Sequence, residues 1–431
     1  MGDCVKRLFV VLMTCVMLFG VGAPARADAD YDYLDVGGIL RQHSIPGGHV
    51  IGGDWDTAST TLTGWYAVTG TLTVNHSLEA SGEVSLILTD GASLTVIGGD
   101  PGELYPGIGV ASGNSLTIYG QTAGSGSLSV TGHSGSAGIG GSAYQSCGAI
   151  TINGGRVTAD VSSNGAAGIG GGYNGDGGAI TINGGTVNAT GYFGAGIGGG
   201  TNSLSSAGIV TINGGTVTAT GTSGAAIGGG LYGHGGTITI SGGTVTANAS
   251  QGAAIGGGIR GNGGTITISG GVVTANGDGS AGIGGGTAGG GSAASAGDGG
   301  TITISGGTVT AHGNYGAGIG GGGTDHPLYS ASGGGTTTIS GGTVTASSGL
   351  STSIGGGYGP YGTGGGGTVY ISGGTVNAVN GIQATPTNGD ANGNKTVYLA
   401  QAQLEGVSAV TEVTGLTVPQ APYYGTKDLY T

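Results

Sequence analysis

The chain has 431 residues, of which 112 are glycine, 9 are proline and only 7% are charged. Such a composition excludes an ordinary globular domain with a charged surface, and without a repeat it would indicate a disordered, low-complexity chain. The formal net charge of −13 opposes binding to nucleic acid or to anionic lipid.

The first 27 residues have the pattern of a secretory signal peptide. A basic pair, Lys6 and Arg7, precedes a long apolar run, and Ala25-Arg26-Ala27 follows that run as a small-residue cleavage site. We therefore expect residues 1–27 to be removed and a secreted chain to begin at Asp28. An uncleaved membrane anchor is the alternative, although the apolar run is short for a membrane-spanning helix.

Cleavage at this site changes the charge and the cysteine content. Five basic and twenty acidic residues then remain, which gives a net charge of −15. Cys147 is the one cysteine left in the mature chain, so an intrachain disulfide is excluded. We expect no nucleic-acid partner and no membrane insertion after cleavage.

Two irregular segments precede the repeat. Residues 28–64 are predicted to form an N-terminal segment and cap, and residues 65–132 show alternating strands such as Thr71–Val74 that predict irregular β-helix coils. Trp55 and Trp65 lie here. We expect them to form an aromatic cap over the open end of the helix, because an open edge strand invites aggregation; a ligand platform is the alternative.

Residues 133–382 contain eight copies of one repeat. Its consensus is T-I-T-I-(N/S)-G-G-T-V-T-A, a short link, G-A-(G/A)-I-G-G-G and a loop of variable length. The Gly-Gly pair recurs every 28–36 residues. A segment of constant length carries a scaffold, and a segment of variable length carries loops on one face.

Within the scaffold, apolar and hydroxyl side chains alternate with a period of two. In Thr237–Ile240 the isoleucines point to one face of a strand and the threonines to the other. Gly242-Gly243 follows as a turn, since glycine adopts positive φ without strain. One repeat cannot bury its apolar face alone, whereas stacked repeats bury a continuous core.

Stacking predicts three interior columns. The isoleucine column is Ile152, Ile182, Ile212, Ile240, Ile268, Ile304, Ile339 and Ile371; the valine column is Val157, Val187, Val217, Val245, Val273, Val309, Val344 and Val376; the alanine column is Ala159, Ala189, Ala219, Ala247, Ala275, Ala311, Ala346 and Ala378. The predicted fold is an all-β, right-handed parallel β-helix (a solenoid), with one coil per 28–36-residue repeat; the hand follows that of parallel crossovers in general. Residues 383–431 lose the pattern, and we expect this C-terminal segment to be truncated.

A resemblance to a family rests on three segments upstream of the repeat and on the repeat itself. Trp65–Val68, Gly82–Gly91 and Gly113–Gln121, followed by I-T-I-N-G-G-T-V-T-A and A-G-I-G-G-G units, resemble bacterial cell-surface glycine-rich β-helix repeat proteins over most of residues 60–400. The Gly-Gly-Thr-Val-Thr unit is more loosely similar to carbohydrate-binding β-helix proteins. The resemblance implies a secreted or extracellular protein at the cell surface.

Tyrosines in the variable loops are the candidate binding residues. Loops on one face of a solenoid lie close together, and an aromatic row beside Asn, Ser and Asp is suited to stacking on sugar rings. Ordinary loop packing is the alternative. The candidate glycan-binding residues are Tyr144, Tyr173, Tyr232, Tyr329, Tyr358 and Tyr361.

The acidic loop residues do not form a catalytic pattern. Asp176, Asp278, Asp298 and Asp325 have irregular spacing and no accompanying base, so we predict no catalytic residues, no metal site and no enzyme. Gly175–Gly178 and Gly297–Gly300 faintly resemble calcium-binding repeats, although such repeats need an acidic ligand in every turn. No cofactor is expected, with calcium as the alternative.

Outward T-x-T pairs, at Thr216/Thr218, Thr244/Thr246, Thr308/Thr310 and Thr343/Thr345, resemble ice-binding faces. Arg156, Asn188, Val272 and Asn377 interrupt the array.

The function we predict is a non-catalytic adhesin or stalk that binds an extracellular polysaccharide or host glycan through its loops. A β-helix polysaccharide lyase or hydrolase, a purely structural spacer and an ice-binding protein are the alternatives.

Overall fold

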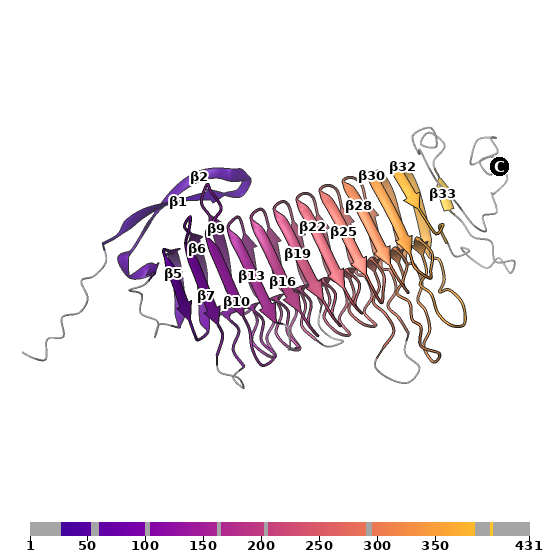
Figure 1. Cartoon of the computed structure of the whole chain (residues 1–431), viewed down its shortest axis with the longest axis horizontal. Coiled ribbons are helices and arrows are strands. Elements are labelled where there is room, and N and C mark those ends of the chain that lie inside the picture. Colours follow the sequence, from indigo (N-terminus) through magenta and orange to yellow (C-terminus); the bar gives the residue numbers. More distant parts are fainter. Residues whose placement is uncertain are drawn as a thin grey trace, which may run out of the picture.

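The protein is a parallel β-helix. The computed structural model describes residues 27–52, 60–99, 104–161, 165–201, 206–289, 295–383 and 397–399. These residues contain no α-helix, and all their strands pair in parallel except one N-terminal hairpin. Figure 1 shows successive coils stacked side by side along one rod. The predicted parallel β-helix is confirmed, whereas residues 1–26 of the predicted signal peptide, Trp55 and nearly all of the C-terminal segment lie outside the described residues.

Each coil of the repeat contributes three strands, one to each of three parallel sheets, which we name after their sequences. The Thr-Ile sheet contains β3 (Val50–Ile51), β4 (Thr61–Val68), β6 (Leu78–Leu88), β9 (Ser115–Gly120), β12 (Ala149–Ile152), β15 (Ala179–Ile182), β18 (Ile209–Ile212), β21 (Thr237–Ile240), β24 (Thr265–Ile268), β27 (Thr301–Ile304), the first parts of β30 (Thr336–Ser348) and β32 (Thr368–Ala378), and β33 (Val397–Leu399).

The other two sheets follow in each coil. The Thr-Val sheet contains β5 (Thr71–Val74), β7 (Ser93–Ile97), β10 (Ser127–Thr131), β13 (Arg156–Val161), β16 (Thr186–Gly191), β19 (Thr216–Gly221), β22 (Thr244–Ala249), β25 (Val272–Gly277), β28 (Thr308–Gly313) and the second parts of β30 and β32. The Ile-Gly sheet contains the start of β6, β8 (Ile108–Gly109), β11 (Ile139–Gly140), β14 (Ile169–Gly170), β17 (Ile197–Gly198), β20 (Ile227–Gly228), β23 (Ile255–Gly256), β26 (Ile283–Gly284), β29 (Ile319–Gly320) and β31 (Ile354–Gly355).

The core consists of identical side chains stacked in register. Ile240, for example, pairs with Ile212 of one neighbouring coil and Ile268 of the other. All members of the three predicted columns are at most 2% exposed, and the isoleucines of the Ile-Gly sheet are fully buried. The period-two prediction is therefore confirmed across the whole repeat.

Glycine turns and asparagine hydrogen bonds shape the corners of the coils. The second glycine of each Gly-Gly pair has φ between 78° and 81°, as at Gly155 and Gly307, which confirms the predicted turn. Just before this turn, the amide of Asn183 donates to Oδ1 of Asn153, and the amide of Asn213 donates to Oδ1 of Asn183, both at 2.8 Å. These ladder bonds link coils that the core already aligns.

An antiparallel hairpin covers the outer side of the first coils. It consists of β1 (Ala29–Asp35) and β2 (Ile39–Ile45), with 3-10 turns at Val36–Gly38 and Gly47–His49. Its Tyr33 packs 5.2 Å from Trp65 and 4.6 Å from Tyr119, measured between ring centroids.

This aromatic cluster lies on a different surface from the one predicted. The neighbours of Trp65 and Tyr119 in sequence, Tyr66 and Ile118, belong to the interior core, so Trp65 and Tyr119 point outward. The predicted end cap at Trp65 is therefore wrong in its position. The aromatic rings pack between the Thr-Ile sheet and the hairpin, and Figure 1 shows the hairpin near the N-terminal end of the rod.

Cys147 is a free cysteine that the core encloses. Burial raises the pKa of its thiol to about 12, so the thiol stays protonated at neutral pH.

In the part of the chain that the structure describes, no helix has the length and apolarity that crossing a membrane requires.

Candidate binding surface on the loops

The loops that follow the Ile-Gly sheet stack on one another through backbone hydrogen bonds. The backbone amide of Tyr144 donates to the carbonyl oxygen of Tyr173 at 2.6 Å. At the equivalent position near the other end, the backbone amide of Thr324 donates to the carbonyl oxygen of Tyr358 at 2.8 Å. Between them the same bond joins Tyr232 to Ile259 and Arg260 to Thr287. Equivalent loop positions therefore form one column along the helix, which we call the loop column.

Tyr144 and Tyr173 form an exposed aromatic pair in the N-terminal part of this column. Their ring centroids are 5.5 Å apart and their planes meet at 82°, an edge-to-face arrangement. The exposed fractions are 67% for Tyr144 and 36% for Tyr173. The structure thus brings two of the six predicted tyrosines into contact.

A second aromatic pair, Tyr192 and Phe193, escaped the sequence prediction. Their centroids are 4.6 Å apart at 81°, and each residue is 38% exposed. They lie in the short link before the Ile-Gly strand, not in the variable loop. A hydrogen bond from the amide of Leu231 to the carbonyl of Phe193 (2.7 Å) places this link beside the loop column.

Tyr232 contacts an arginine of the next coil. It is half-buried, and the guanidinium carbon of Arg260 is 5.6 Å from its ring centroid, which is a cation–π contact. One face of this ring is therefore occupied by a neighbouring side chain. The single row of tyrosines that the sequence predicted is divided here.

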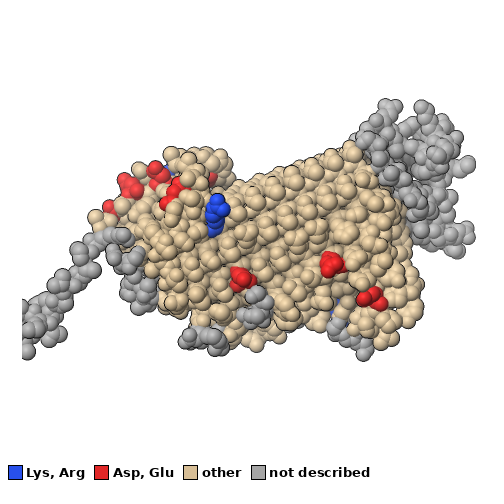
Figure 2. Space-filling view, in the orientation of Figure 1, with Lys and Arg blue, Asp and Glu red and all other residues tan. Residues whose placement is uncertain are grey.

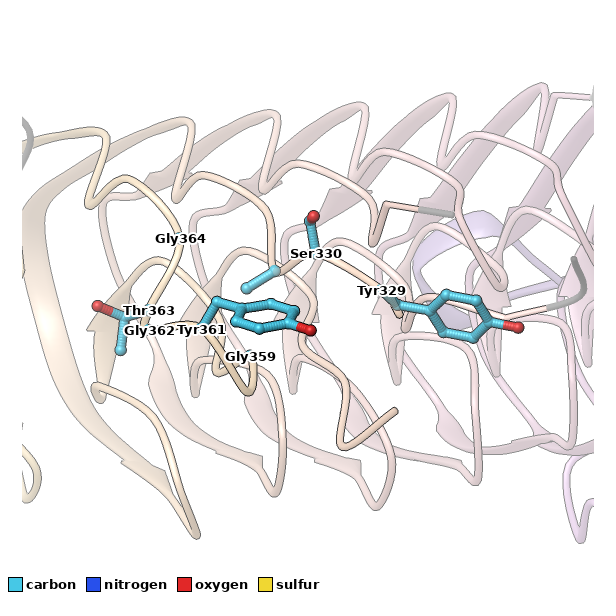
Figure 3. Close-up of a pocket in the computed structure, with 8 residues that line it drawn as sticks. Tyr329, Ser330, Gly359, Tyr361, Gly362, Thr363 and Gly364 are labelled. Atoms are coloured by element: carbon cyan, nitrogen blue, oxygen red, sulfur yellow. The ribbon is translucent and has the colours of Figure 1, made fainter. Parts of the chain in front are cut away.

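Tyr329 and Tyr361 line a pocket in the C-terminal part of the surface. The pocket has a volume of about 190 Å³ and is also lined by Ser330, Gly359 and Thr363. Figure 3 shows the ring of Tyr361 between Thr363 and the ring of Tyr329. Two aromatic rings and two hydroxyl side chains therefore share one concave site.

The rings of this pocket are held in place by contacts at its rim. Tyr361 is 84% exposed, yet its hydroxyl donates to the carbonyl oxygen of Pro327 at 2.8 Å. The imidazole of His326 stacks on Tyr329 with centroids 4.1 Å apart. The pocket therefore presents a broad aromatic surface in a defined orientation.

Tyr358 belongs to a neighbouring group with Tyr315, a second residue that the sequence prediction missed. The amide of Tyr358 donates to the carbonyl oxygen of Tyr315 at 2.8 Å. The hydrogen bond from the Tyr315 hydroxyl to Asp325 and the charge of that carboxylate raise the pKa of Tyr315, and Asp278 adds a smaller effect. Asp278 and Asp325, distant in sequence, thus both act on one tyrosine.

Asp176 and Asp298 occupy a different column and support the coils. Oδ1 of Asp176 accepts the amide of Ser206 at 2.6 Å, and Oδ1 of Asp298 accepts the amide of Gly333 at 3.0 Å. His234 and Asn262 occupy the equivalent positions in the coils between Asp176 and Asp298. Nδ1 of His234 accepts a hydrogen bond from the backbone amide of Asn262 (3.0 Å), and Oδ1 of Asn262 accepts one from the backbone amide of Asp298 (2.9 Å). Each side chain therefore caps a backbone donor of the next coil.

This ladder explains the acidic residues of the Gly-Asp-Gly-Gly segments without a bound ion. Among the described residues, no three His, Cys, Asp or Glu side chains gather as a metal site would require. The absence of a cofactor stays a prediction, with calcium as its alternative.

The ladder gives a first testable prediction. Asp298→Ala leaves the amide of Gly333 without its acceptor and is expected to lower the free energy of unfolding by about 1–2 kcal/mol. Asp298→Asn keeps an acceptor oxygen and is expected to change it by less than about 0.5 kcal/mol. Urea denaturation of the two variants measures the difference; equal losses for both would show that charge, not the hydrogen bond, matters.

The hydroxyl face of the Thr-Val sheet is flat and uncharged along much of its length. From β16 to β30 its strands contain no Lys, Arg, Asp or Glu, and Figure 2 shows only isolated acidic residues on this side of the C-terminal half of the rod. Thr216 and Thr218 pair with Thr244 and Thr246 in register. Val272 then breaks the array, because it stands between Thr244 and Thr308.

Comparisons with known proteins agree with this architecture. A family model described as a β-helix repeat matches residues 150–173, 180–201, 210–231, 238–259, 266–287, 302–323 and 369–393. No curated protein and no solved structure matches the sequence. The matched segments begin within the Thr-Ile strands and, up to residue 323, end in the loop column, so each covers most of one coil. The chain therefore contains seven segments that match a β-helix repeat, in agreement with its parallel β-helix fold.

Proposed function

We propose that the chain is a secreted, non-catalytic surface protein whose loops bind neutral glycans. The observation that carries the proposal is the pocket between Tyr329 and Tyr361. Aromatic faces supply apolar contact area, and the hydroxyls of Ser330 and Thr363 supply hydrogen-bonding groups. Pyranose rings offer both an apolar face and hydroxyl groups, so the pocket matches their chemistry.

The charge of the chain selects among glycans. After cleavage at the predicted site the net charge is −15. Asp325 lies in the same coil as the pocket residue Tyr329, and Asp298 lies in the coil before it. A strongly negative protein repels acidic polysaccharides. Neutral glycans are therefore the proposed ligands, in keeping with export to a cell surface.

Removing the most exposed ring tests this function. Tyr361→Ala is expected to weaken binding to neutral polysaccharide about 10-fold, because the stacking surface is lost. Tyr370→Ala is the matched control, because Tyr370 is also partly exposed (39%) but lies on strand β32 and does not line the pocket. Titration with soluble glucomannan, galactomannan and xyloglucan measures both affinities. Equal affinities for the two variants would refute a role for the pocket.

A polysaccharide lyase or hydrolase is a second candidate, because a hydrogen bond joins the Tyr315 hydroxyl to the Asp325 carboxylate on the loop surface. A carboxylate beside a bound sugar is the usual acid or base of glycoside hydrolysis. Release of new reducing ends from the same polysaccharides, lost in Asp325→Asn, would favour this candidate over a binding protein.

A further inference from the structure

We infer that the loop surface has two subsites which hold a single extended polysaccharide chain along the axis of the β-helix. The C-terminal subsite is the Tyr329–Tyr361 pocket. The N-terminal subsite consists of Tyr144 and Tyr173, with Tyr192 and Phe193 beside them. The inference rests on the proposed function. It specifies that the ligand is long enough to span both subsites and that it lies along the axis of the β-helix.

The two subsites share one face of the protein. Tyr173 and Tyr358 are equivalent members of the loop column, and each accepts a backbone hydrogen bond from the coil before it. Tyr361 follows Tyr358 by three residues in the same loop. A straight ligand that lies along the loop column therefore meets both subsites.

The N-terminal subsite is continuous across neighbouring coils. A Cβ atom on Gly165 would come within 2.5 Å of Cδ2 of Tyr173, so this ring rests on the link of its own coil. The link of the next coil carries Tyr192 and Phe193, and the carbonyl oxygen of Tyr192 accepts the amide of Ser223 one coil further on (2.8 Å). Four partly exposed aromatic rings thus occupy adjacent coils.

The distance between the subsites follows from the pairing of the Ile-Gly sheet. Six successive pairings lead from Ile169, in the coil of Tyr173, to Ile354, in the coil of Tyr361. At about 4.8 Å per strand step, the subsites are about 29 Å apart along the axis. The described part of the loop column between them contains Tyr232, Ile259 and Arg260 as well as small residues such as Thr287 and Gly323.

Two linked subsites give a characteristic dependence on ligand length. A chain that spans both makes its second contact at a high effective concentration, which increases the affinity by about 100-fold or more. A shorter oligosaccharide occupies the subsites independently. The intact protein is therefore expected to bind two short chains but one long chain.

Size-fractionated glucomannan oligosaccharides, titrated against the full chain, test this inference. The affinity is expected to rise about 100-fold or more once the oligosaccharide exceeds about 29 Å, while the stoichiometry falls from two ligands per protein to one. Two double variants, Tyr144→Ala with Tyr173→Ala and Tyr329→Ala with Tyr361→Ala, are each expected to abolish the rise and leave one short-chain site. Tyr370→Ala is expected to retain the rise, and matching urea midpoints show that the variants are folded.

The outcomes separate this inference from the proposed function. Binding of short chains without any rise for long chains, or an unchanged rise in the Tyr144 and Tyr173 variant, overturns the two-subsite inference but leaves a glycan-binding pocket. Absence of binding at every length overturns both.

Discussion

Gly256→Ala is expected to lower the free energy of unfolding by about 4 kcal/mol or more. Gly256 has φ of +137°, and an added Cβ would lie 2.0 Å from the carbonyl oxygen of Gly284 in the next coil. Because that oxygen belongs to the backbone of the Ile-Gly sheet, it moves only if the coils separate. Steric overlap and backbone strain therefore act together. The midpoint of urea denaturation measures the loss.

Gly113→Ala is the matched control for this substitution. Gly113 also has positive φ, +90°, but an added Cβ would meet no atom within 4 Å. Gly113→Ala is expected to lower the free energy of unfolding by about 1–2 kcal/mol, because only the unfavourable positive φ of the new alanine acts. Equal losses at Gly113 and Gly256 would contradict the account, because they would show that glycine serves only the backbone conformation and not the close approach of coils.

Ile212→Ala is expected to lower the free energy of unfolding by about 2–5 kcal/mol, because the side chain is fully buried in the isoleucine column. Ile209 lies three residues earlier on the same strand, β18, and is 55% exposed. Ile209→Ala is therefore expected to change the free energy by less than about 0.5 kcal/mol.

These two isoleucines test the orientation of the repeat with the same chemistry on one strand. Urea denaturation, with hydrogen exchange of the neighbouring strands β15 and β21, measures both effects. Because each coil contacts only its neighbours, the loss of protection in Ile212→Ala should centre on these coils. A similar loss for Ile209→Ala would show that the period-two assignment of the strand is wrong.

The scaffold could be predicted from the sequence because its signal repeats eight times. The alternation in Thr237–Ile240 specifies one face of a strand, and the Gly-Gly pair specifies a turn that only glycine adopts easily. Since every coil carries the same alternation, the neighbours of each interior side chain are identical residues. Register and core follow from that identity.

The irregular parts lack this redundancy, and there the sequence prediction failed in part. Trp65 alternates with Tyr66, and both are aromatic, so the pattern does not say which of them faces the interior. The hairpin β1–β2 decides it by covering Trp65. Tyr192, Phe193 and Tyr315 precede the Ile-Gly strand of their coil, whereas the loop pattern in the sequence indicates only residues that follow this strand.

The candidate site was predicted as one row and consists of separate groups. Tyr144 with Tyr173, and Tyr329 with Tyr361, come together as expected for loops that stack. Tyr232 instead meets Arg260 of the next coil. Such side-chain contacts between variable loops depend on loop length and rotamer, which no repeated pattern encodes.

Retention of the chain, from Asp28 onward, on immobilised polysaccharides tests the central claim most directly. The panel contains neutral glucomannan, galactomannan and xyloglucan beside an acidic pectin, each with and without calcium. The account predicts retention by at least one neutral polysaccharide, independent of calcium and reduced when Tyr329 and Tyr361 are both replaced by alanine. Passage of the unmodified chain through every column without retention would contradict glycan binding and leave the β-helix as a structural spacer.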